Sequence, residues 1–241
     1  FLCLCDSFLL CKNRKGYYIL LTGNESAALL MDYILNERKK KGFLSVNGVV
    51  YNTIVTSSLG SKIAANYGVK TESFLTGFKY IGDRIQYYEE HGGPEFEFGY
   101  EESYGCLIKP FVRDKDGIQA ILLYCEMALY YKQHDITLDE AYHELGVKYG
   151  FHKTKLFNIA FKGSNGAKKL KILMDTLINK PFTKFLDNEV VYVDDYYNLL
   201  RKNVKTGFVS TINGIPMSSL IKFTFKDGTN IAVRPSGTEQ K

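Results

Sequence analysis

The chain has 241 residues, of which 45% are hydrophobic, so it can bury one large core or two modest ones, and its length favours two domains. A formal net charge of +5, spread over scattered lysines, argues against a nucleic-acid partner. The apolar opening, residues 1–11, is shorter than the about 20 residues that cross a bilayer, which argues against a membrane partner. Five cysteines, without a CxxC pair or histidines at zinc-ligand spacing, favour a reducing, cytoplasmic location.

The first part of the chain alternates between strand-like and helix-like runs. Strands are predicted over 17–22, 49–56, 71–74, 95–98 and 106–108, and helices over 25–38, 61–67 and 80–90. The basic run 38–41 suits the C-terminal end of the first helix, where cations are favoured. The alternation predicts an α/β layer with a largely parallel or mixed sheet, in which ligands bind beyond the strand ends.

Two further helices are predicted after this sheet. Asp116 caps a helix over 117–132, and a second helix opens with capping-box character at Thr137 and ends near Gly150. Apolar residues repeat at three- and four-residue steps in the first of these helices: Ile118, Ile121, Leu122, Cys125 and Leu129. We expect this helix to cover one face of the sheet.

A second domain is predicted to begin near Gly150, where the pattern changes. Strands are predicted over 155–160, 189–193, 207–211, 220–225 and 229–233, with a glycine turn at 163–166 leading into a helix over 167–179. Asp227 and Gly228 suit the tight turn of a hairpin between the last two strands. An α+β domain with its helix on one face of an antiparallel sheet is expected.

The run Phe98-Gly99-Tyr100-Glu101-Glu102-Ser103-Tyr104-Gly105 lies between two of the predicted strands. Carboxylates accept hydrogen bonds from adjacent sugar hydroxyls, and the flanking glycines allow a ligand to approach closely. The motif therefore indicates a sugar-binding loop. An acidic hairpin tip is the alternative.

The run Arg234-Pro235-Ser236-Gly237-Thr238-Glu239 follows the last predicted strand. Arg234 offers a planar fork of charged donors, Ser236 and Thr238 offer hydroxyls, and Gly237 lets backbone N–H groups turn towards an anion. These residue types indicate a phosphate site. An ordinary turn with a solvated arginine is the alternative.

Together, in this order and spacing, the two motifs resemble the alpha-D-phosphohexomutases, the phosphoglucomutase and phosphomannomutase family. Members of that family have four domains around one cleft, which carry in turn a phosphoserine, a magnesium loop, sugar recognition and phosphate recognition. The resemblance implies that residues 1–150 are the third, α/β domain. Residues 151–241 would be the fourth, a smaller α+β domain of the TATA-binding-protein-like kind, truncated at its C-terminus.

The resemblance also implies roles for single residues. Glu101 and Ser103 match positions that contact sugar hydroxyls, and Lys79 matches a lysine that reaches into the cleft, although a solvated surface lysine is the alternative. The positions that match the site for the phosphate not being transferred are Arg234, Ser236, Gly237 and Thr238. We expect Glu101 and Arg234 to converge across a groove between the domains.

The departures from the family lie at the N-terminus. The metal loop of the family reads Asp-x-Asp-x-Asp-Arg, and in this register only Asp6 supplies a carboxylate, because Leu2 and Leu4 occupy the other two positions. We therefore interpret residues 1–11 as the remnant of that junction. Mg²⁺ is the cofactor of the intact family, and this chain is not expected to bind it. The family's nucleophilic serine segment is absent from the sequence.

The resemblance implies part of an enzyme that interconverts hexose 1-phosphate and hexose 6-phosphate by intramolecular phosphoryl transfer. The chain would recognise the hexose phosphate but would not catalyse the reaction alone. Its expected protein partners are the missing N-terminal domains. A non-catalytic phosphosugar-binding module and a gene remnant without function are the alternatives.

Overall fold

The computed structural model describes residues 8–161 and 165–235. The chain divides into two compact units, Phe1–Lys155 and Leu156–Lys241. Within the described ranges, no helix combines the length and the apolar character needed to cross a membrane.

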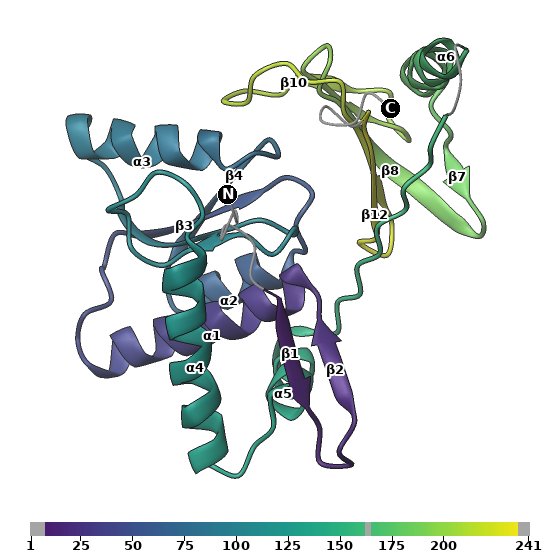
Figure 1. Cartoon of the computed structure of the whole chain (residues 1–241). Coiled ribbons are helices and arrows are strands. Elements are labelled where there is room, and N and C mark those ends of the chain that lie inside the picture. Colours follow the sequence, from purple (N-terminus) through teal and green to yellow (C-terminus); the bar gives the residue numbers. More distant parts are fainter. Residues whose placement is uncertain (1–7, 162–164, 236–241) are drawn as a thin grey trace. The chain divides into compact units, whose positions relative to one another are not determined.

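The first unit is built on a mixed sheet, as predicted (Figure 1). Over residues 8–155 the strands of this sheet are β3 (Gly48–Thr53), β4 (Lys70–Phe74), β5 (Glu95–Tyr100) and β6 (Cys106–Leu107). Their order is β4-β3-β5-β6, with β3 parallel to both of its neighbours and β6 antiparallel to β5. The helices are α1 (Gly23–Lys40), α2 (Leu59–Asn66), α3 (Lys79–His91), α4 (Gly117–Gln133) and α5 (Leu138–Tyr149). This arrangement confirms the predicted α/β class.

Helices cover both faces of this sheet because the side chains of β3 alternate between two apolar cores. Val50 belongs to the core that α1, α2, α4 and α5 share. Val49 and Tyr51 point the other way and pack with Ile81 and Ile85 of α3. All six residues of β3 are buried, as expected of a central parallel strand, and Figure 1 shows α3 on one side of the sheet with α1 and α2 on the other.

Arg38 has a larger role than the predicted one of a cation at a helix end. Its guanidinium binds the buried carboxylate of Glu97 on β5, and it also donates to the carbonyl of Ile108, 3.2 Å away. The second oxygen of Glu97 accepts from the Ser45 N–H at 2.9 Å. The pair therefore ties the end of α1 to the sheet, and the remaining acceptor of the buried carboxylate is satisfied.

Helix α4 contributes to the core on one face of the sheet, but not through the apolar stripe from which the helix was predicted. Ile118, Ile121, Leu122, Cys125 and Leu129 are exposed. The residues of α4 that are buried in the core with α1 and α5 are Ala120, Leu123, Tyr124 and Met127. The helix is apolar over most of its surface, so the three- and four-residue spacing fits more than one face and cannot choose between them. The predicted cap holds, since the Asp116 carboxylate accepts from the N–H groups of Ile118 and Gln119.

The N-terminal end of the described chain forms an antiparallel ribbon that was not predicted in full. Its strands are β1 (Leu9–Lys12) and β2 (Tyr18–Leu21). Cys11 and Leu21 are buried, whereas Leu10 and Leu20, which pair with each other, point outward and are exposed. Arg14 in the connecting turn binds the carboxylates of Asp135 and Glu140, which anchors the ribbon to the end of the helical layer.

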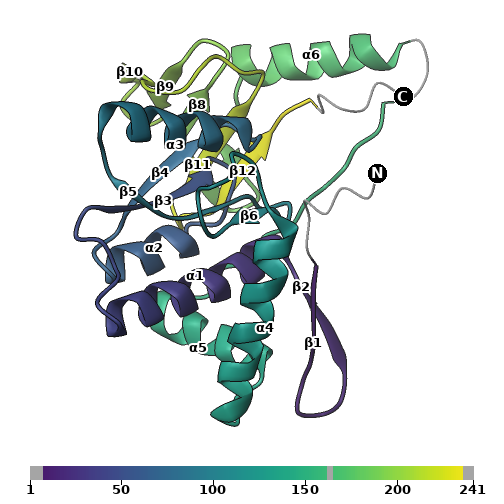
Figure 2. The same cartoon turned by 60° about the vertical axis from the view of Figure 1, so that its left-hand side comes forward.

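The second unit is an α+β domain, as predicted (Figure 2). In its described residues the helix is α6 (Gly166–Asn179), and the strands are β7 (Lys184–Phe185), β8 (Asn188–Asp195), β9 (Leu200–Asn203), β10 (Val209–Thr211), β11 (Ile221–Phe225) and β12 (Asn230–Val233). The strand order is β10-β9-β8-β11-β12, with β7 paired to β8, and every pairing is antiparallel. Met174 of α6 packs against Val193 and Phe223 on one face of this sheet.

One strand predicted for the second unit is absent from the described residues, and β7 and β9 were not predicted. Residues 155–160 have no regular secondary structure, because apolar alternation alone does not supply a partner strand. β9 was not predicted because its sequence, Leu-Arg-Lys-Asn, is mostly polar and exposed. The predicted hairpin through Asp227 and Gly228 is confirmed.

Adjacent leucines of α4 test which face of that helix is buried. Leu123 is 8% exposed and Leu122 is 67% exposed. Leu123→Ala should lower the free energy of unfolding by about 2–5 kcal/mol, because it opens a cavity in the core. The matched Leu122→Ala should stay within about 0.5 kcal/mol of the parent in urea denaturation. Equal losses in the two variants would contradict the assigned face.

Candidate functional site

The loops that follow the parallel strands gather at one edge of the first unit's sheet. β3, β4 and β5 run in the same direction, so the positions that end them, Thr53, Phe74 and Tyr100, lie at the same edge. Parallel sheets bind ligands at this carboxyl edge. The predicted sugar loop begins directly after β5 and therefore lies where a ligand is expected.

Glu101 joins two of these loops. Its side chain is buried, and the residue is only 5% exposed. One carboxylate oxygen accepts from the Gly77 N–H at 2.7 Å, and the other lies 3.6 Å from the ammonium of Lys115. Gly77, in the loop after β4, has a φ of +115°, a conformation that side chains other than glycine rarely adopt. We call this arrangement of Glu101, Gly77 and Lys115 the Glu101 clasp.

Burial raises the pKa of Glu101 above its usual value, while the Gly77 N–H and the Lys115 ammonium act in the opposite direction. The clasp thus holds a carboxylate in a poorly solvated position next to a cation. A group placed in this way interacts more strongly with a polar ligand than it would in bulk water.

The start of α1 packs directly on the sugar loop. A Cβ atom at Gly23 would lie 2.2 Å from the carbonyl oxygen of Glu102 and 2.6 Å from the backbone nitrogen of Tyr104, so only glycine fits there. The Glu102 carboxylate accepts from the hydroxyl of Thr53, at the end of β3, at 2.9 Å. The loop is therefore held from the strand side and from the helix side.

The structure brings the predicted residues of the first unit to this edge but gives them different surroundings. Ser103 is exposed within the loop. Lys79 is the first residue of α3 and is also exposed, with its ammonium 4.9 Å from the centre of the Tyr80 ring. Glu101, by contrast, is buried and organises the loops.

Lys115 belongs to this site and was not predicted. A Cβ atom at Gly105 would lie 2.3 Å from the Lys115 Cδ, so Gly105 leaves the space through which the lysine reaches Glu101. The available signal was the charged run Arg113-Asp114-Lys115-Asp116, just before a helix. Of this run, only Asp116 was assigned a role, as a helix cap.

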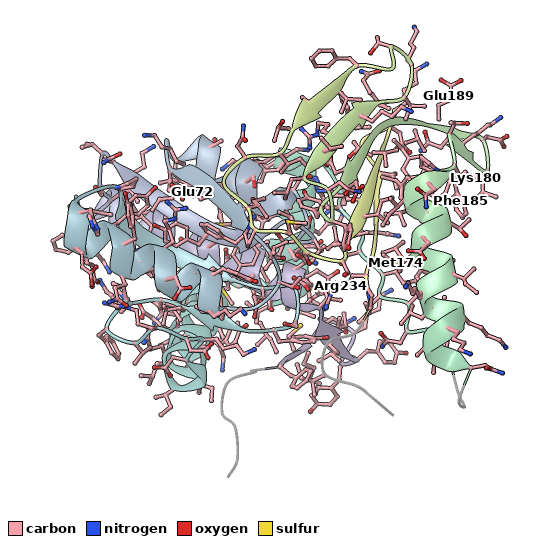
Figure 3. The ribbon with its side chains drawn as sticks, turned by 90° about the horizontal axis from the view of Figure 1, so that it is seen from above. Glu72, Met174, Lys180, Phe185, Glu189 and Arg234 are labelled. Atoms are coloured by element: carbon pink, nitrogen blue, oxygen red, sulfur yellow. The ribbon has the colours of Figure 1, made fainter. Side chains whose placement is uncertain are left out.

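Of the predicted phosphate site, the structure describes Arg234. It is exposed and directly follows β12, as Figure 3 shows. Ser236, Gly237, Thr238 and Asp6 lie outside the described residues. Among the residues that the structure does describe, no group of three or more His, Cys, Asp or Glu side chains could hold a metal ion.

The geometry defines an α/β domain with a polar site at the carboxyl edge of its sheet, and comparison with known proteins defines its family. The family described as phosphoglucomutase/phosphomannomutase, alpha/beta/alpha domain III, matches residues 22–149, more than half of the chain. The chain belongs to this family.

Similar proteins agree with this assignment. The phosphoglucomutase of Staphylococcus epidermidis is 33% identical over 232 residues, and that of Staphylococcus haemolyticus is 34% identical over 229. Both alignments cover 95% of this chain, but only 41% and 40% of the relatives. A crystal structure of parafusin from Paramecium shares the fold, with a TM-score of 0.61 at 21% identity, covering 98% of this chain and 37% of that one. The chain thus spans about two fifths of the length of its relatives.

The clasp predicts a pH dependence. A folded-state pKa that is raised above the unfolded value means that Glu101 contributes stability below its unfolded pKa of about 4.3 and loses it as the pH rises through the folded pKa. Relative to Glu101→Gln, the parent's free energy of unfolding should therefore fall as the pH rises above about 4.3. Urea denaturation of both proteins measures this difference. The exposed Glu95→Gln is the control, and a difference for Glu101→Gln that does not change with pH would contradict the assignment.

Proposed function

We propose that this chain supplies the substrate-holding part of a phosphohexomutase that interconverts hexose 1-phosphate and hexose 6-phosphate. The observation that carries this proposal is the Glu101 clasp, which lies at the carboxyl edge of the sheet and within the residues that match domain III. In this proposal the first unit holds the sugar and the loop that begins at Arg234 holds a phosphate.

The loop after β5 suits a polyhydroxylated ligand. A carboxylate has about four acceptor positions, so Glu101 keeps capacity for sugar hydroxyls after it has accepted the Gly77 N–H. The exposed Ser103 hydroxyl can donate and accept. Lys115 and Lys79 place positive charge beside the sugar, which favours a ligand that also carries phosphate.

Arg234 with Ser236, Gly237 and Thr238 would hold the phosphate that does not react. Its planar guanidinium can bind two phosphate oxygens at once. An isomerase that moves a phosphate between the two ends of one sugar must hold either end at the reacting centre. One site that binds the sugar hydroxyls and a second site that binds the distant phosphate would position either end of the sugar for reaction.

We place neither the metal nor the nucleophile on this chain. Magnesium prefers near-octahedral oxygen ligands, and a pattern with Leu2 and Leu4 beside Asp6 offers one carboxylate, so these residues do not fit the ion. The chain covers 41% of a full-length relative, so the transfer chemistry would come from domains equivalent to the remaining length.

Binding tests the proposal. Glucose 1-phosphate and mannose 1-phosphate should bind the chain weakly, and Arg234→Ala should weaken both by at least about tenfold, because it removes charge-assisted hydrogen bonds. Calorimetry measures the affinities. Lys226→Ala is the control, since this exposed lysine lies in the turn at the other end of β11 and β12. Equal affinity in Arg234→Ala and the parent would remove the phosphate site.

An activity assay tests the proposal that this chain holds the substrate but does not catalyse the reaction. The chain alone should show no conversion of glucose 1-phosphate to glucose 6-phosphate in a coupled assay with Mg²⁺, because in this proposal the serine that transfers phosphate belongs to the remaining length of the relatives. An intact phosphoglucomutase serves as the positive control. Mutase activity from this chain alone would overturn the proposal that it only holds the substrate.

A further inference from the structure

The sheet of the second unit has one face that α6 does not cover, and Arg234 belongs to it. Along β11, Ile221, Phe223 and Phe225 are buried in the core with α6, so Lys222 and Thr224 point to the opposite face. Along β12, Ile231 and Val233 pack towards that core, whereas Ala232 and Arg234 are exposed. Lys222 and Arg234 therefore lie on the same face of neighbouring strands.

The register brings these two cations within reach of one anion. Lys222 pairs directly with Ala232, and Arg234 lies two residues further along the same strand direction. Such diagonal neighbours are about 7–8 Å apart, a distance that long side chains span. Ala232, opposite Lys222, has only a methyl group.

A buried carboxylate holds this part of the sheet together. Asp194 of β8 pairs with Lys222 on one side and with Arg201 of β9 on the other. It is 0% exposed and accepts two hydrogen bonds from the Arg201 guanidinium, at 2.6 and 2.8 Å. Burial lowers the pKa of Lys222, and the charge of Arg201 acts in the same direction, whereas the charge of Asp194 acts in the opposite direction.

The row across β9, β8 and β11 carries two cations and one carboxylate. Because Arg201 already binds both oxygens of Asp194, the row has a net positive charge next to Arg234. A phosphate monoester carries nearly two negative charges at neutral pH, so a second cation near Arg234 matches its charge.

We propose that Lys222 is a second cation of the Arg234 phosphate site and that Asp194 positions it. The ligand class is a phosphate monoester, and the inference rests on the proposed function. Lys222 would contact the ligand as a point charge beside the planar guanidinium of Arg234.

Charge-removing and charge-keeping variants test this role. Lys222→Met should weaken the binding of inorganic phosphate and of glucose 1-phosphate by about tenfold, whereas Lys222→Arg, which keeps the charge, should stay within about threefold of the parent. Lys226→Met is the matched control and should bind like the parent. Restored binding in Lys222→Arg separates a role of the charge from a role in folding.

A titration of the parent chain tests the same role of Lys222 without a substitution. Titration with inorganic phosphate should shift the backbone amide signals of Lys222 and Ala232 and leave that of Lys226 in place. Unchanged affinity in Lys222→Met, beside a loss in Arg234→Ala, would overturn this inference and leave the proposed function standing. Unchanged affinity in both variants would overturn the phosphate site itself.

Discussion

The buried carboxylate of Glu101 is the constraint on which the candidate site depends. A charged group removed from water must be paired and hydrogen-bonded, and Glu101 finds its partners in two loops that are distant in sequence, at Gly77 and at Lys115. The need to satisfy one carboxylate therefore fixes the loop after β4 against the loop after β5. Lys79 and Ser103, which are exposed, gain a defined position because the backbone that carries them is held.

The second unit also contains a buried carboxylate that is paired with a cation. Asp194 is buried in the sheet and is paired with Arg201, and its neighbour Lys222 lies on the face that carries Arg234. In both units a buried carboxylate that is paired with a cation lies close to the residues that we assign to the ligand. A site built in this way is rigid before the ligand arrives, which lowers the cost of binding.

Local sequence patterns were sufficient to predict the structure where a residue type has a single physical reason to occupy its position. Asp116 at a helix start, Gly228 in a hairpin turn and the alternation of the first unit were all predicted correctly. The exposed face of α4 and the polar strand β9 were not, because the first depends on which elements already cover the sheet and the second on its pairing with β8. Lys115 was not predicted because its contact with Glu101 joins residues from separate loops, and no local sequence pattern indicates such a contact.

Amide hydrogen exchange at Gly77 shows whether Glu101 holds the loop after β4. The Ile54 amide, which donates to the Phe74 carbonyl at 2.8 Å, is the internal reference. The Gly77 amide should be protected in the parent and should exchange faster in Glu101→Ala, while the exchange of Ile54 should be unchanged. Equal exchange of Gly77 in both proteins would contradict this role of Glu101.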